Sequence, residues 1–233
     1  MPNTCSDSRL TSHNSRFKSF NEENFHSLCD VICKKDSDLE NILNQYGHPP
    51  MWTRACTFET LIHFILEQQV SLASARAALI KLKEKTGTIT PLKILALSDE
   101  ELKSCYFSRQ KLKYARHLAE AIVSKKLALK KLLTLPDEDV RKELTSIKGI
   151  GNWTADVYLL FALQRTDVFP TGDLAMMNAF KDIKKLDKNI SKDDSLRVAE
   201  QWKPYRSIAT MMMWHFYLEK RKTRVGTADG KRQ

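Results

Sequence analysis

Apolar side chains recur at helical spacing along most of this 233-residue chain. Residues three and four positions apart share one face of a helix, so this spacing predicts helices with one buried face. The strongest run consists of Phe58, Leu61, Ile62, Ile65 and Leu66. Between residues 21 and 222, no segment alternates apolar and polar residues in the manner of a half-buried strand. The chain is therefore predicted to fold as an all-α protein.

Residues 144–155 carry two glycines close together, in the order L-T-S-I-K-G-I-G-N-W-T-A. Gly149 and Gly151 lack a Cβ, so the backbone there can adopt a positive φ and approach another molecule closely. Asn152 is a favourable N-cap for the helix that is predicted to follow. The free N–H groups of this turn, beside the charge of Lys148, form a candidate site for a phosphate oxygen. The alternative is an ordinary Gly-rich turn between two helices, with no ligand.

A second segment with glycine and proline occupies residues 166–174 and contains V-F-P-T-G-D, which ends at Asp173. Asp173 begins another predicted helix. Aspartate is favoured at such a position because its carboxylate accepts hydrogen bonds from the free N–H groups of the first turn. Taken alone, this segment predicts an N-cap and nothing more.

Together, the segments I-K-G-I-G-N-W-T-A and D-V-F-P-T-G-D resemble the helix-hairpin-helix DNA glycosylase superfamily (HhH-GPD). The chain is most similar to the alkylation-repair branch, the 3-methyladenine DNA glycosylase II type, from about Phe58 to Leu218. The resemblance implies two helical subdomains with the active-site cleft between them, and Asp173 as the catalytic carboxylate. It also implies that the partner is damaged double-stranded DNA, from which the target base is flipped out of the stack.

The same resemblance assigns DNA contacts to the hairpin and to the helix start. These residues are Lys148, Gly149, Gly151, Asn152 and Thr154. In the family, backbone carbonyls of the hairpin also hold a monovalent cation that bridges to a phosphate. The matching carbonyls here belong to Thr145, Ile147 and Ile150. No other cofactor is expected, because the iron–sulfur cysteines of some relatives are absent after Cys105.

Three further side chains match family positions that contact the target nucleotide. Gln69, in L-E-Q-Q-V-S, corresponds to the residue that fills the gap left by the flipped base. A turn with two solvated glutamines is the alternative. Trp153 and Trp214 match pocket aromatics, whose faces attract a cationic alkylated purine, although either one would also suit a helical core. Trp153 stands where relatives with lyase activity carry a lysine, which implies a monofunctional enzyme.

Charge and cysteine usage narrow the class of protein. The chain has 38 Lys and Arg against 28 Asp and Glu, a net charge of +10 that favours a polyanionic partner such as DNA, RNA or an anionic membrane. Its five scattered cysteines are interpreted as free thiols in a reducing compartment. Cys29 and Cys33 lack a second pair of metal ligands, so packing is the favoured interpretation. No apolar run is long enough for a bilayer and no signal peptide is present, so we expect an intracellular protein without membrane contact, in the bacterial cytoplasm or a nucleus.

The predicted organisation is a disordered polar tail at residues 1–20, one helical domain at 21–222 and a basic tail at 223–233. Nothing in the sequence indicates an oligomer, so a monomer is expected. The predicted function is that of a monofunctional glycosylase in base excision repair. It would hydrolyse the N-glycosidic bond of alkylated purines such as 3-methyladenine and 7-methylguanine. The alternatives are a glycosylase for hypoxanthine or an oxidised purine, and a non-catalytic hairpin module that only binds DNA.

Overall fold

The structure is a computed structural model that describes the backbone of residues 19–229 and the side chains of residues 19–222. The predicted basic tail at 223–233 therefore lies outside the described side chains, as do residues 1–18 of the predicted polar tail. Phe20, which the prediction placed in that tail, is buried, and its N–H donates to the carbonyl of Gln164 at 2.9 Å. The packed part of the chain thus includes residue 20.

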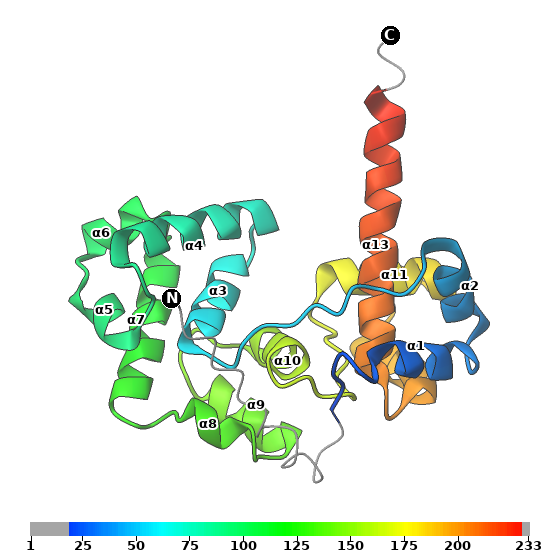
Figure 1. Cartoon of the computed structure of the whole chain (residues 1–233), viewed down its shortest axis with the longest axis horizontal. Coiled ribbons are helices and arrows are strands. Elements are labelled where there is room, and N and C mark those ends of the chain that lie inside the picture. Colours follow the sequence, from blue (N-terminus) through cyan, green and yellow to red (C-terminus); the bar gives the residue numbers. More distant parts are fainter. Residues whose placement is uncertain (1–18, 230–233) are drawn as a thin grey trace.

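The helices form two lobes with α10 (Asn152–Phe161) between them (Figure 1). One lobe contains α3 (Phe58–Glu67), α4 (Leu72–Thr86), α5 (Pro91–Ala96), α6 (Asp99–Ser104), α7 (Arg109–Val123), α8 (Leu129–Leu132) and α9 (Asp137–Thr145). The other contains α1 (Phe25–Cys33), α2 (Ser37–Tyr46), α11 (Leu174–Lys184), α12 (Lys192–Ala199), the 3-10 helix η2 (Glu200–Trp202) and α13 (Arg206–Asp229). The described residues contain no strand beyond one isolated bridge between Ser19 and Arg165, so the all-α prediction is confirmed.

Packing divides along the same lines as the lobes. Helix α10 contacts α9 and α3, while α13 contacts α1, α2 and α11. The segment between α2 and α3 runs from one lobe to the other, and α13 continues well beyond the body of its lobe (Figure 1). Of the two segments that the sequence singled out, the hairpin joins α9 to α10, and the loop at 166–174 joins α10 to α11 of the second lobe.

Side chains next to several helix starts cap the first turn. Thr57, Ser71 and Ser108 each accept a hydrogen bond from the backbone N–H three residues later. Ser98 and Glu101 form a complete capping box at the start of α6. Such caps satisfy donors that have no partner inside the helix, so they are decided within one turn of sequence.

Asp36 joins three elements of the second lobe. Its carboxylate caps α2, lies 2.6 Å from Nζ of Lys184 on α11 and accepts a 2.7 Å hydrogen bond from Nε1 of Trp202 in η2. The side chains of Asp36 and Lys184 are only 2% and 13% exposed. Loss of Lys184 would leave the buried Asp36 carboxylate without a charged partner, and loss of Asp36 would leave Lys184 with only the more exposed Asp38, 2.8 Å away.

Cys29 and Cys33 are buried in the core of the second lobe as free thiols. Burial raises the pKa of Cys29 to about 12 and that of Cys33 to about 11. Within the described residues, no group of three or more His, Cys, Asp or Glu side chains is arranged to hold a metal ion. None of the described helices has the length and apolar character needed to cross a bilayer.

Candidate active site

Asp173 lies at the start of α11, in the loop that joins it to α10. Its Oδ1 accepts a 2.8 Å hydrogen bond from the backbone N–H of Met176, so the predicted N-cap role is present. Both carboxylate oxygens are also engaged by tryptophans. Nε1 of Trp214 donates to Oδ1 at 3.0 Å and Nε1 of Trp153 donates to Oδ2 at 3.0 Å. Three donors from three helices therefore orient one half-buried carboxylate.

The tryptophans thus have a role that the sequence did not indicate. The prediction used their ring faces, as walls of a base pocket, whereas the described contacts to Asp173 use their indole N–H groups. One face of Trp214 stacks on Phe161, with ring centroids 5.0 Å apart and planes at 16°. Trp214 is 9% exposed and Trp153 is half-buried, so Trp153 has the more accessible ring.

An aromatic row extends from Trp214 into the first lobe. Phe161 stacks on Phe64 of α3 at 6.3 Å between centroids, and the guanidinium of Arg54 lies 4.5 Å from the centre of the Phe64 ring. Arg54 also forms a two-pronged ion pair with Glu67, at 2.6 and 3.2 Å. The row links the two lobes next to Asp173, and a stack of flat rings holds the carboxylate's indole partner at a defined angle.

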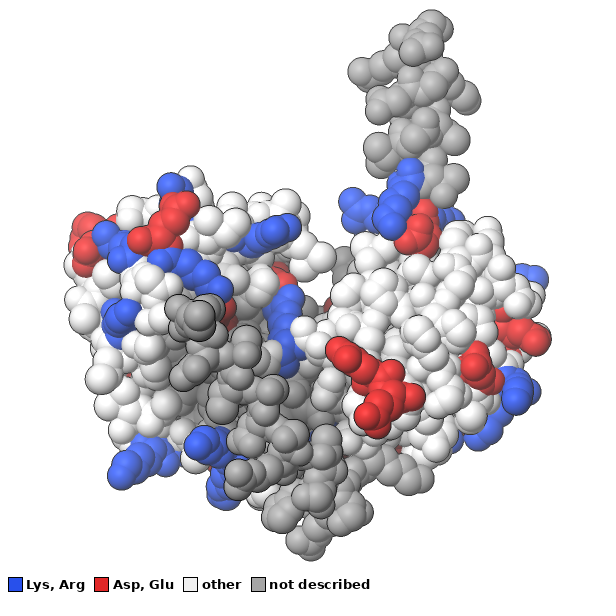
Figure 2. Space-filling view, in the orientation of Figure 1, with Lys and Arg blue, Asp and Glu red and all other residues white. Residues whose placement is uncertain are grey.

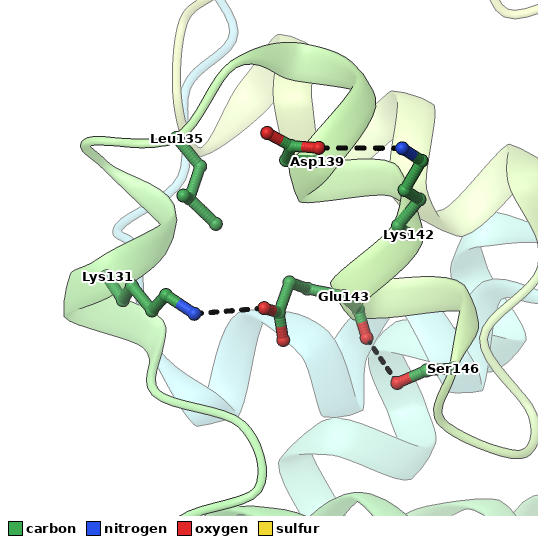
Figure 3. A pocket seen from close by; sticks show the side chains of 6 residues that line it. All are labelled: Lys131, Leu135, Asp139, Lys142, Glu143 and Ser146. Atoms are coloured by element: carbon green, nitrogen blue, oxygen red, sulfur yellow. Dashed lines mark hydrogen bonds and ion pairs between the residues drawn. The ribbon is translucent and has the colours of Figure 1, made fainter.

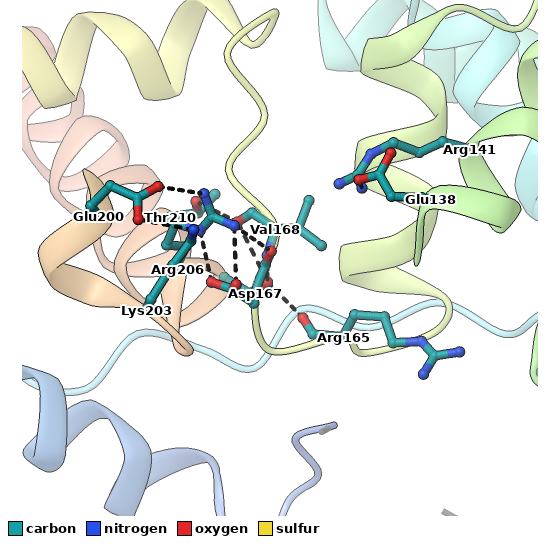
Figure 4. Close-up of polar contacts among 10 residues, drawn as sticks. Glu138, Arg141, Arg165, Asp167, Val168, Glu200, Lys203, Arg206 and Thr210 are labelled. Atoms are coloured by element: carbon teal, nitrogen blue, oxygen red, sulfur yellow. Dashed lines mark hydrogen bonds and ion pairs between the residues drawn. The ribbon is translucent and has the colours of Figure 1, made fainter. Parts of the chain in front are cut away.

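The first residues of α13 anchor the loop at 166–174 (Figure 4). Arg206 donates two hydrogen bonds to the Asp167 carboxylate, from Nε at 2.7 Å and from Nη2 at 3.0 Å. Ser207 accepts a 2.9 Å hydrogen bond from the N–H of Val168, and the Thr210 hydroxyl donates to the carbonyl of Val168 at 3.4 Å. The loop is therefore tied to the same helix that carries Trp214. Helix α13 therefore holds both the loop that carries Asp173 and the indole donor of Trp214.

The hairpin between α9 and α10 has the backbone geometry that its glycines predicted. Gly149 has φ +99°, and a Cβ at this position would collide with the ring of Tyr114. Within the described residues, the N–H groups of Gly149 and Gly151 donate no hydrogen bond, and the first helical bond of α10 runs from Ala155 to Gly151. The turn thus presents several free donors together with the positive end of a helix dipole.

The predicted DNA-contacting residues do not share one environment. Lys148, Gly151 and Asn152 are exposed. Thr154 is only 1% exposed, and its hydroxyl accepts a hydrogen bond from Gln68, so this side chain is already engaged within the protein and its DNA contact stays a prediction. The prediction of Asn152 as N-cap is wrong, because α10 begins at Asn152 and its N-cap is Gly151 in an extended conformation. Glycine is nearly as good as a side-chain cap where the backbone must turn sharply.

An ion pair holds the two hairpin helices together. Nε of Arg141 on α9 lies 2.9 Å from Oδ1 of Asp156 on α10. Burial raises the pKa of the Asp156 carboxyl despite the attraction of Arg141.

The three predicted cation ligands are close in the hairpin. The carbonyl of Ile147 accepts the N–H of Ile150 at 3.0 Å. Within the described residues, the carbonyls of Thr145 and Ile150 accept no hydrogen bond, so their oxygens are available. Neutral carbonyl oxygens are suitable ligands for a hard monovalent cation, and this donor set fits the predicted ion.

Gln69 occupies the turn between α3 and α4 in a left-handed conformation, with φ 57°. It is exposed, whereas the neighbouring Gln68 is half-buried and donates from Nε2 to the carbonyl of Gly149 at 2.9 Å. The turn at Gln69 and the hairpin are therefore in direct contact. The family resemblance assigns a role to Gln69 alone and none to Gln68.

The face shown in Figure 2 carries both signs of charge. A furrow separates the upper parts of the lobes, with Lys and Arg side chains on its first-lobe edge and near the base of the projecting part of α13, and acidic side chains on the near part of the second lobe. A separate hollow of about 400 Å³ lies between α8 and α9 (Figure 3). Its lining residues are Lys131, Leu135, Asp139, Lys142, Glu143 and Ser146. None of them contacts Asp173, so this hollow is not the candidate site.

A model of the HhH-GPD superfamily of base excision DNA repair proteins matches residues 62–204. The chain belongs to this superfamily. The match includes the hairpin, the loop that carries Asp173 and the turn at Gln69, and it ends just before α13.

Relatives of this HhH-GPD protein are DNA-3-methyladenine glycosylases. DNA-3-methyladenine glycosylase 1 of Schizosaccharomyces pombe is 32% identical over 67% of this chain and 71% of its own length. The DNA-3-methyladenine glycosylase of Saccharomyces cerevisiae is 26% identical over 83% of this chain and 80% of its own length.

Solved structures agree with the sequence comparisons. The S. pombe 3-methyladenine DNA glycosylase in complex with abasic DNA is similar with a TM-score of 0.73 and 28% identity, covering 81% of this chain and 95% of that one. The 8-oxoguanine glycosylase/lyase of Clostridium acetobutylicum, in complex with double-stranded DNA, has a TM-score of 0.71 but only 18% identity. The second likeness shows the fold alone.

Several residues that build the site of this HhH-GPD protein escaped the sequence analysis. Phe64 and Phe161 lie in apolar segments, and no motif in the sequence distinguishes Arg206 or Ser207. Gln68 had a local signal, because it is a polar residue next to a predicted wedge at the end of an apolar helix. The others act through partners that are distant in sequence, so no pattern within their own segments identifies them.

Removing the indole donor of Trp214 is expected to slow base release without unfolding the protein. Trp214→Phe keeps a ring to stack on Phe161 but deletes the hydrogen bond to Asp173. A hydrogen bond to a charged group is worth about 1.5–3 kcal/mol, so we expect a single-turnover rate about tenfold lower or more. Trp202→Phe is the matched control for tryptophan removal, since its N–H bonds Asp36 instead. An unchanged rate in Trp214→Phe would show that this donor does not matter.

Proposed function

We propose that this HhH-GPD protein is a monofunctional DNA glycosylase that releases alkylated purines from double-stranded DNA and leaves an abasic site. The observation that carries the proposal is the Asp173 carboxylate, oriented by two indole N–H groups between the lobes. A non-catalytic module that only binds phosphate groups does not require such a carboxylate. The similarity to DNA-3-methyladenine glycosylases over most of the chain supports the same class of substrate.

The hairpin would hold the DNA backbone. Its free N–H groups at Gly149 and Gly151, the start of α10 and the exposed Lys148 are suited to phosphate oxygens. The carbonyls of Thr145, Ile147 and Ile150 would hold a monovalent cation, which supplies positive charge beside a phosphate. These phosphate contacts do not depend on the DNA sequence, which suits a repair enzyme whose lesions occur in any sequence.

Asp173 would act at the sugar of the flipped nucleotide. As the C1′–N bond breaks, its electron pair leaves with the base and positive charge develops on the sugar. A carboxylate held in place by fixed donors stabilises that charge with little reorganisation. A water molecule then supplies the oxygen that bonds to C1′ and releases a proton. An alkylated purine already carries a positive charge, so it leaves without a general acid.

The aromatic side chains support a cationic base as the substrate. Trp153 is half-buried beside Asp173 and would offer its ring face to the base, an attraction of about 0.5–2 kcal/mol for a cation. Because position 153 holds tryptophan rather than an amine, no Schiff base can form there, which supports hydrolysis without strand cleavage. All of these groups come from one chain, and we propose that the enzyme acts as a monomer.

Base release from duplex oligonucleotides tests the proposal. Substrates carrying 7-methylguanine, 3-methyladenine or hypoxanthine are incubated with excess enzyme, and released base and strand breaks are measured. We expect release of the methylated purines, an alkali-labile abasic site and no direct strand cleavage. Faster release of hypoxanthine would favour the alternative glycosylase, and DNA binding without release of any base would favour a non-catalytic module.

Loss of the hairpin lysine is expected to weaken DNA binding and leave the chemical step unchanged. In Lys148→Ala one phosphate contact is lost, so the slope of log affinity against log salt should fall by about 1 for every DNA sequence. The maximal single-turnover rate should stay near that of the wild type, because Lys148 makes no contact with Asp173. Lys203→Ala, which removes an exposed lysine paired with Glu200 in the other lobe, is the control. An unchanged salt slope would contradict a phosphate contact at Lys148.

A further inference from the structure

Gln68 makes contacts that neither the phosphate grip nor the chemistry at Asp173 uses. It ends α3 as the C-cap, one residue before the exposed Gln69. Its Nε2 donates to the carbonyl of Gly149 at 2.9 Å and to the hydroxyl of Thr154 at 3.1 Å. One side-chain amide thus bridges the turn at Gln69 to both sides of the hairpin turn.

Helix α7 contacts both the end of α3 and the hairpin turn. Nζ of Lys111 donates to the carbonyl of Leu66 at 2.6 Å, at the end of α3. One turn further along α7, the ring of Tyr114 packs directly on Gly149, where no Cβ could fit. The end of α3 and the hairpin are therefore held against one helix as well as against each other.

We propose that Gln68 is a positioning residue that makes the hairpin and the turn at Gln69 move as one rigid unit. This inference rests on the proposed function, in which the hairpin binds a phosphate, and on the role predicted for Gln69, which is to fill the gap left by the flipped base. The hairpin then determines where the duplex backbone lies, and the Gln68 bridge determines where Gln69 meets the stack. Misplacement of a contributing group by about 1 Å can cost on the order of 100-fold in rate.

The chemistry of the amide explains why glutamine suits this position. Its NH2 group has two N–H donors, and the two partners here are a carbonyl oxygen and a hydroxyl that can accept. Glutamate has the same shape but, when ionised, only accepts, so it would repel the Gly149 carbonyl. Methionine has similar length and no donor. Both variants therefore remove the link to the Gly149 carbonyl without changing the volume greatly, although a glutamate can still accept a hydrogen bond from the Thr154 hydroxyl.

The test compares paired and unpaired lesions. Single-turnover release of 7-methylguanine at saturating enzyme is measured for the wild type, Gln68→Glu and Gln68→Met, in duplex opposite cytosine and in single-stranded DNA. The matched control is Gln201→Glu, in which an exposed glutamine of the other lobe loses a 3.0 Å hydrogen bond to the carbonyl of Val198. We expect both Gln68 variants to lose about 10- to 100-fold on the duplex and about threefold or less on the single strand, because only the duplex needs its gap filled.

A second measurement is independent of base release. Fluorescence of 2-aminopurine placed opposite an abasic-site analogue reports entry of a side chain into the stack, and anisotropy reports affinity. We expect the Gln68 variants to lose the fluorescence change while their affinity stays within about threefold of the wild type, since the hairpin donors remain. The Gln201 variant should behave as the wild type in both assays.

The outcomes separate the inference from the proposed function. Equal losses on duplex and single strand, or an unchanged duplex rate with a normal fluorescence change, would overturn the role of Gln68. A wild-type protein that changes the 2-aminopurine signal but releases no base would instead refute the proposed function, and the fluorescence assay would still decide on Gln68. Thermal unfolding identifies a variant that fails to fold, in which case the other Gln68 variant decides.

Discussion

Asp173→Asn is expected to lower the single-turnover rate of methylated-base release by about 100- to 1000-fold. The substitution keeps the size of the side chain, and asparagine is an equally good N-cap for α11, so the first turn stays intact. It removes the negative charge that would face the positive charge developing on the sugar. It also places an amide NH2 against one of the two indole donors, where two donors cannot pair.

DNA binding provides the control for this prediction. Affinity for duplex containing an abasic-site analogue should change little, because the hairpin and its donors are untouched. Asp182→Asn is the matched variant, since Asp182 is an exposed carboxylate of the same helix, paired with Lys220 at 2.7 Å. Its release rate should equal that of the wild type. If Asp173→Asn released base at the wild-type rate, the carboxylate would have no part in the reaction.

Asp36→Asn is expected to reduce the free energy of unfolding by about 3–5 kcal/mol, the usual result of breaking a buried ion pair. The variant leaves Lys184, 13% exposed, without its nearest charge and weakens the hydrogen bond from Trp202. Three elements of the second lobe meet at this point, so the loss should appear in a single unfolding transition. Chemical denaturation at pH 7 measures it, and a loss under about 1 kcal/mol would contradict the prediction.

The pH dependence of the same variant has a defined sign. Burial opposes ionisation of Asp36, but hydrogen bonds from Lys184 and Trp202 outweigh it and lower the pKa of the carboxyl. The stabilisation is therefore fully present above the pKa of an aspartate in the unfolded chain, about 4. It is lost as the pH falls through the lower pKa of Asp36 in the folded protein. The difference between wild type and Asp36→Asn should shrink on acidification below about pH 4. Asp38→Asn, which removes the more exposed partner of Lys184, should cost much less.

The sequence itself determined the features that depend on neighbouring residues. Helical spacing predicted an all-α fold, and α3, α4 and α6 are each capped by a Ser or Thr side chain directly before the first helical residue. Gly149 adopts the positive φ that its lack of a Cβ permits, and Asp173 caps α11. These outcomes follow from turns and caps, whose partners lie within about four residues along the chain.

Tertiary structure decided which side chains meet. Asp173 receives its indole hydrogen bonds from residues 20 and 41 positions away, and Gln68 reaches the hairpin across 81 positions. It also buried Thr154, which the family resemblance had placed among the DNA contacts. Such contacts depend on how whole helices pack, and a periodic apolar face leaves their mutual angle and register open. The sequence therefore identified the carboxylate and the hairpin, and helix packing determined the long-range contacts that orient them.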